Sequence, residues 1–140
     1  MPTIPNWLLL FLPVLLCACS LPDRHMQHQQ AHLDSNLLEL DVATESGDFF
    51  NAQNNRHSFN GNEGIWFKLP VPGLICLGMD YTSFDADVAF LDENQNIVEI
   101  QTLRAHGPAG CPHQTIFGMV ELAAGWFKNH QILPGTPLKD

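Results

Sequence analysis

Between Leu37 and Leu138 the chain is a series of short apolar runs separated by turn residues, and this spacing constrains the fold most strongly. In Leu37–Ala43, leucine and valine alternate with acidic residues, as in a half-buried strand. The runs Asp87–Asp92 and Asn96–Leu103 flank a polar turn and predict a hairpin. Further strands are predicted over residues 64–69, 74–79, 116–122 and 134–138.

Two short helices interrupt the predicted strands. Thr44 is a candidate N-cap for a helix through Phe49 and Phe50. Residues 125–130 are predicted to form one helical turn, whereas 51–64 and 104–113 are predicted to be loops, and Pro70–Gly73 a turn. Many short strands with this turn spacing indicate an all-β fold with minor α content. We expect one compact β-sandwich or barrel-like domain over residues 37–140.

The first 20 residues contain no charged side chain and resemble an export signal. The apolar run from Trp7 to Leu16 reaches only about 15 Å as a helix, half of a bilayer's hydrocarbon core. The following Leu16-Cys17-Ala18-Cys19 resembles a bacterial lipobox. This resemblance implies cleavage of residues 1–18, lipidation of Cys19 and a periplasm-facing lipoprotein. Ser20 after the lipidated position favours the outer membrane, and plain secretion is the alternative.

Residues 19–36 are polar, rich in glutamine and histidine, and show little apolar periodicity. They are interpreted as a flexible tether between the anchor and the domain. His25, His28 and His32 have a spacing that offers a metal site as the alternative to a solvated linker.

The charge balance excludes one class of partner. Six Lys and Arg residues against 15 Asp and Glu residues give a formal charge of -9. Nucleic-acid binding needs a basic face, which this chain lacks the residues to form. We expect no nucleic-acid partner and no cofactor, and attachment to the membrane through the lipid at Cys19.

Three motifs occur in an order that resembles the family domain of unknown function 192. They are Asp87–Asp92 (DVAFLD), Ile97–Ile100 (IVEI) and Val120–Phe127 (VELAAGWF). The resemblance extends over residues 37–138 and implies a compact β-sandwich or barrel with short helices. The family's W-M-K-N-T motif is replaced here by Gly78–Thr82 (GMDYT), which lacks its Lys and Asn.

The four cysteines divide by position. If cleavage precedes Cys19, Cys17 is lost with the signal and Cys19 carries the lipid, which leaves Cys76 and Cys111 in an oxidising compartment. Some envelope members of the family have cysteines in similar places, and the resemblance implies a Cys76–Cys111 disulfide. A redox pair is the alternative, although redox cysteines usually lie close together in sequence.

Candidate site residues are few. Asp87 aligns with the family's aspartate, and with His106 and His113 it is a candidate for acid–base or metal chemistry. Tyr81 and Thr82 are predicted to lie with Asp87 on a ligand rim. The alternation of Val120, Glu121 and Leu122 predicts that the Glu121 side chain points outward.

No strong catalytic motif or metal-ligand pattern is present, so we expect a non-catalytic binding or accessory module. One alternative is a small hydrolase or metal-dependent enzyme that uses Asp87 with His106 or His113. Another is a structural subunit of an envelope assembly, which a large exposed apolar patch would favour.

Overall fold

The computed structural model describes residues 26–54 and 56–140, which form seven strands and two short helices. In chain order these elements are β1 (Gln27–Leu33), β2 (Asn36–Ala43), α1 (Ser46–Asn54), β3 (Glu63–Gly73), β4 (Ala86–Leu91), β5 (Ile97–Leu103), β6 (Ile116–Ala123), α2 (Trp126–Asn129) and β7 (Leu138–Lys139). The strands make one sheet in the order β5-β4-β6-β3-β2-β1-β7, which confirms the predicted all-β class.

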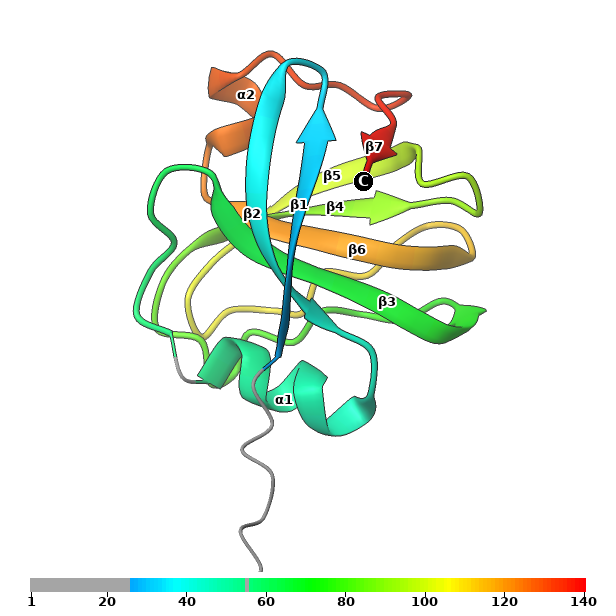
Figure 1. Cartoon of the computed structure of the whole chain (residues 1–140). Coiled ribbons are helices and arrows are strands. Elements are labelled where there is room, and N and C mark those ends of the chain that lie inside the picture. The colour runs from blue at the N-terminus through cyan, green and yellow to red at the C-terminus, as the bar shows by residue number, and fades with distance from the viewer. Residues whose placement is uncertain (1–25, 55) are drawn as a thin grey trace, which may run out of the picture.

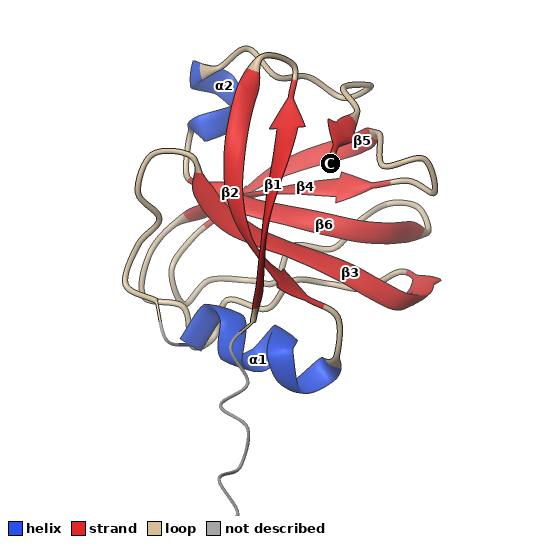
Figure 2. Cartoon of the chain, viewed as in Figure 1, coloured by secondary structure: helices blue, strands red, loops and turns tan. Residues whose placement is uncertain are grey.

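The sheet curls into a half-barrel (Figure 1). Its neighbouring strands pair antiparallel except β2 and β3, which are parallel. A parallel pair needs a crossover connection, and α1 lies within that connection. Figure 2 shows α1 and α2 at opposite ends of the sheet.

Both faces of the sheet are buried, and this property decides the environment of the site residues. One face packs around Trp66, Val120 and Leu122 and is covered by α2. The other face packs around Phe67 and Met119, under α1 and the loops. Adjacent residues of β6 therefore enter two different cores, because side chains alternate along a strand.

The C-terminal segment links the two ends of the strand order. β7 pairs with β1, while Leu138 N–H donates to the carbonyl oxygen of Gln95, next to the start of β5. Gly135 N–H and the carbonyl oxygen of Thr136 both bond to Ile97. These bonds hold the sheet in its curled shape.

The predicted tether extends too far toward the domain. Residues 27–33 form β1, which pairs along its whole length with β2. The ring nitrogens of His28 lie within hydrogen-bonding distance of the Glu39 and Asp41 carboxylates, at 2.7 and 3.2 Å. The sequence pattern misses this strand because only Ala31 and Leu33 are buried, near its end. The predicted signal, residues 1–18, and the tether up to residue 25 lie outside the described residues.

Three predicted elements differ in extent. Pro70–Gly73 continues strand β3 instead of turning, with a register shift between Lys68 and Gly73, because proline lacks the N–H that a ladder bond needs. Residues 74–79 form only one bridge, Leu77 to Gly110. The predicted closing strand at 134–138 is confined to β7. The hairpin of β4 and β5 and the helical turn α2 are confirmed.

Candidate functional site

A cavity of about 360 Å³ lies between α1 and the segment 75–82. Phe67 of β3 and Met119 of β6 form its floor. The remaining lining residues come from the helix and the segment: Ser46, Phe49, Phe50, Gln53, Asn54, Ile75, Cys76, Leu77, Gly78, Asp80, Tyr81 and Thr82. An apolar hollow with a few polar groups is the usual form of a small-ligand site.

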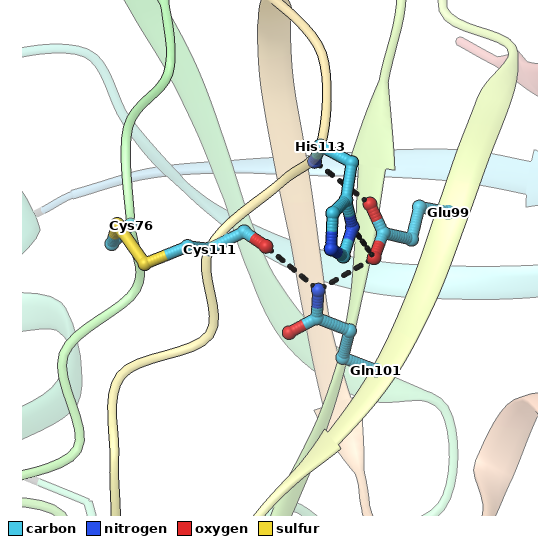
Figure 3. The surroundings of a disulfide bond; sticks show 5 residues. All are labelled: Cys76, Glu99, Gln101, Cys111 and His113. Carbon is cyan, nitrogen blue, oxygen red and sulfur yellow. Dashed lines mark hydrogen bonds and ion pairs between the residues drawn. A yellow bond between two sulfur atoms is a disulfide. The ribbon is translucent and has the colours of Figure 1, made fainter.

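The predicted disulfide between Cys76 and Cys111 is confirmed, and it holds one wall of the cavity. Beside it, Leu77 and Gly110 exchange two backbone hydrogen bonds of 2.8 and 2.9 Å. Figure 3 shows the loop side of the bridge, where the Gln101 side chain donates to the carbonyl oxygen of Cys111 at 2.8 Å. The segment 75–82 is thereby tied to the loop of residues 104–113.

His106 supports the same wall and makes no contact with Asp87. Its backbone N–H donates to the carbonyl oxygens of Met79 and Thr82, and its ring Nδ1 lies 2.8 Å from the carbonyl oxygen of Asp80. His106 has a positive φ of 54°, so the loop turns sharply at this residue. These contacts fix the turn that carries Asp80, Tyr81 and Thr82.

Two of the three predicted rim residues line the cavity. Thr82 is buried, whereas Tyr81 is 73% exposed and its ring lies edge-on to Phe50, with centroids 6.0 Å apart. Asp87 is not among the lining residues. It belongs to the opposite face of the sheet, because Asp87 pairs with Thr102 and Leu122 rather than with residues of the α1 side.

Asp87 is a satisfied structural carboxylate. Thr102 Oγ1 donates to it at 2.7 Å and the N–H of Gly125 at 3.0 Å. Gly125 precedes α2 and has a φ of 83°, which favours glycine. Asp87 thus fixes the start of α2 on the sheet. It also borders a second hollow of about 540 Å³, with Phe127 and Leu133.

His113 lies on the other side of the sheet from Asp87. Its ring Nδ1 is 2.8 Å from Glu99, and its N–H donates to the same carboxylate (Figure 3). Burial raises the pKa of Glu99, but hydrogen bonds from Gln101 and His113 outweigh it and leave that pKa below its usual value. The structure therefore brings neither His113 nor His106 together with Asp87. These three residues do not form the shared site that the enzyme alternative predicted.

Glu121, whose side chain was predicted to point outward, has no exposed surface. It pairs across the sheet with Ile65 and Val88, on the face covered by α1. Gln53 of α1 donates to both of its carboxylate oxygens at 3.2 Å. The prediction of an outward side chain is wrong because the outward face of β6 carries a second core. The alternation along β6 does not by itself indicate that α1 covers this face.

Burial raises the pKa of Glu121 to about 7, although the Gln53 hydrogen bond and the nearby Arg56 charge act in the opposite direction. Arg56 is itself paired with Asp41, and its guanidinium lies 5.3 Å from the ring centre of Phe59. Gln53 also lines the cavity. One amide side chain therefore separates the cavity from a buried carboxyl that titrates near neutral pH.

The described ranges 26–54 and 56–140 contain no group of three or more His, Cys, Asp or Glu side chains arranged to hold a metal ion. Within the same ranges, no helix is long and apolar enough to cross a membrane.

These features define a class: a small curled β domain with a cover helix, a ligand-sized cavity and a buried glutamate beneath it. The chain belongs to the family domain of unknown function 192, described as an uncharacterized ACR, whose model matches residues 29–139. The family that the motifs predicted is confirmed, and its start at residue 29 agrees with the position of β1.

Two solved structures are similar in fold. One is a candidate transcription regulator from Sinorhizobium meliloti, with a TM-score of 0.76, 17% identity, and coverage of 81% of this chain and 94% of that one. The other is a protein of unknown function from Novosphingobium aromaticivorans, with a TM-score of 0.78, 15% identity, and coverage of 85% and 89%. Among curated proteins, none matches the chain. At these identities the likeness concerns the fold alone.

Proposed function

We propose that this chain is an envelope lipoprotein whose domain is a non-catalytic binding module, with the ligand held in the cavity between α1 and the segment 75–82. The observation that carries the proposal is the cavity itself. Aromatic and aliphatic side chains form most of its walls, a disulfide braces one side, and a few polar groups remain available. By contrast, the catalytic candidates Asp87, His106 and His113 are each held by separate partners.

The anchor proposal rests on the sequence around Cys19, and the fold supports a specific orientation for it. Gln27 begins β1 at the end of the sheet where α1 lies (Figure 1). Eight positions separate Cys19 from Gln27, a reach of at most about 28 Å when extended. In a lipoprotein with this geometry, the α1 end would stay within about 28 Å of the outer-membrane surface.

The cavity is tested by methyl NMR of the full chain labelled at methionine. Met119 lies in the cavity floor, whereas Met26 is not among the lining residues and is the internal reference. A small neutral probe, 3,3-dimethylbutan-1-ol, is expected to shift the Met119 methyl signal and leave Met26 unchanged. No shift of Met119 in folded protein at high millimolar probe would overturn the binding proposal.

A matched pair of variants ties the signal to the cavity. Gly78 lines the cavity and a Cβ there would meet open space, so Gly78→Trp should fill the hollow without a clash. Gly47 is equally open and is not a lining residue, so Gly47→Trp is the control. The probe should shift Met119 in the control and not in the filled variant.

The anchor is tested by metabolic labelling with a fatty-acid analogue. The label should be lost in Cys19→Ser and kept in Cys17→Ser, since Cys17 is expected to leave with the signal. Label retained in Cys19→Ser would refute lipidation at that residue. Separation of inner and outer membranes then tests the outer-membrane assignment.

A further inference from the structure

Four aromatic rings line the cavity. Phe49 and Phe67 meet edge-on with centroids 5.3 Å apart, beneath the opening. Phe50 and Tyr81 meet edge-on at the opening and are 60% and 73% exposed. Aromatic faces carry negative electrostatic potential and attract organic cations within about 6 Å of the ring centre.

The charges around the cavity have one sign. Asp80 lines it, and none of the described lining residues is a Lys, Arg or His. Within the described part of the chain, no hydrogen bond or ion pair engages the Asp80 carboxylate. The nearby cation, Arg56, is paired with Asp41 and is not a lining residue. An anionic ligand would therefore meet repulsion from Asp80 without a compensating positive group.

The polar lining residue Gln53 also favours a ligand that carries a positive charge or a hydrogen-bond donor. Gln53 uses its side-chain N–H groups on Glu121, which leaves its carbonyl oxygen as an acceptor. Glu121 lies directly behind it and adds negative charge when ionised. The cavity thus offers the Gln53 carbonyl oxygen, the Asp80 carboxylate and aromatic rings. These groups are complementary to a small apolar molecule that carries an ammonium group.

We propose that this cavity is an organic-cation site, which binds an alkylammonium group against the exposed rings of Phe50 and Tyr81 and beside the carboxylate of Asp80. The proposal rests on the proposed binding function of the same cavity and specifies its ligand class. Two sources supply that chemistry in an envelope, a free amine and the ammonium headgroup of a lipid.

The test compares choline with 3,3-dimethylbutan-1-ol, which has the same shape and no charge. The full chain is kept in nanodiscs of phosphatidylglycerol, a lipid without an ammonium group, and binding is measured from the Met119 methyl shift, with empty nanodiscs as the blank. Choline is expected to bind about tenfold more tightly, as desolvated cation–π contacts allow. Equal affinities would overturn the cation proposal and leave the binding function standing. Failure of both probes to bind would refute both proposals.

Conservative variants separate charge from shape. Phe50→Leu keeps an apolar side chain without a ring, and Asp80→Asn keeps the shape without the charge. Each should reduce choline affinity about threefold or more and change the affinity of the neutral alcohol little. Asp34→Asn removes the same charge at the β1–β2 turn, distant from α1 in Figure 1, and should bind choline as the parent does. Unchanged choline binding in both Phe50→Leu and Asp80→Asn would place the cation elsewhere.

The source of the cation is assigned in a second set of nanodiscs that contain phosphatidylethanolamine. A lipid-headgroup site predicts competition, so the apparent choline affinity should fall when this lipid is present. A free-amine site predicts the same choline affinity in both kinds of nanodisc.

Discussion

Glu121→Gln should remove the pH dependence of stability that this buried carboxyl imposes. The folded protein holds the pKa of Glu121 at about 7, against 4.5 for the ordinary group. Because the folded state prefers the protonated acid, its stability is full below about pH 4.5 and falls as the pH rises to about 7. Each pKa unit corresponds to about 1.4 kcal/mol, so the loss reaches about 3 kcal/mol above pH 7.

Glutamine keeps the shape and does not titrate, although its amide group facing Gln53 costs about 1 kcal/mol in hydrogen bonding at every pH. We therefore expect Glu121→Gln to be less stable than the parent at pH 4.5, equal near about pH 5 and about 2 kcal/mol more stable at pH 8. Arg56 lies beside the carboxyl and Glu63 near Arg56, and both remain in the variant.

The assay is urea unfolding of parent and variant across pH 4.5 to 8, with the difference in unfolding free energy plotted against pH. Taking the difference removes the contributions of the other carboxylates, such as Glu39 and Glu99, which are common to both proteins. Glu93→Gln, on an exposed turn residue, is the control and should show no pH-dependent difference. A flat difference for Glu121→Gln would refute the buried, proton-binding role of this side chain.

Three further changes test the supports of the site. Replacing Cys76 and Cys111 by serine opens a 35-residue loop and should lower the unfolding free energy by about 3–4 kcal/mol in urea; alkylation of the parent should find these two thiols only after reduction. Asp87→Asn leaves one buried donor near α2 without its carboxylate partner and should lower the unfolding free energy by about 1–3 kcal/mol. Ligand binding in the cavity should be unchanged by this substitution. Gly64→Ala places a Cβ against the backbone of β6 and should cost about 3 kcal/mol, whereas Gly78→Ala enters open space and should be neutral by thermal unfolding.

Local sequence patterns predicted the elements whose partners lie nearby in the chain. The hairpin of β4 and β5 was predicted from two apolar runs around a polar turn, and Asp92 accepts hydrogen bonds from Asn94 and Asn96 in that turn. Helix α1 was predicted from Thr44 onward but continues to Asn54, four residues into the predicted loop. The last turn of α1 contains no apolar run that would have predicted it, since Ala52 is the only buried residue of the helix.

Strands that depend on distant partners were harder to predict. β1 is mostly polar on its exposed face, and its pairing with β2 and β7 keeps it in the sheet. The segment 74–79 has a strand-like sequence, yet its neighbour is a loop that the disulfide draws alongside it. Composition and alternation do not say which partner is within reach.

The candidate site shows the same division. Tyr81 and Thr82 were predicted as rim residues and line the cavity, whereas Asp87, predicted to lie with them, is on the opposite face. Gln53 was not singled out, because an amide in a predicted loop carries no signal of its own. Only α1 packing over the sheet brings Gln53 to Glu121.

The sequence by itself determined the all-β class, the family, the pair of cysteines that bridge and the acidic charge, because these follow from local alternation, motifs and composition. The tertiary structure alone decided which strand faces are covered. By placing α1 over the outward face of β6, it turned Glu121 from an expected surface charge into a buried acid beneath an aromatic cavity. The physical reason is that alternation specifies two faces of a strand, whereas burial of each face depends on residues far away in the chain.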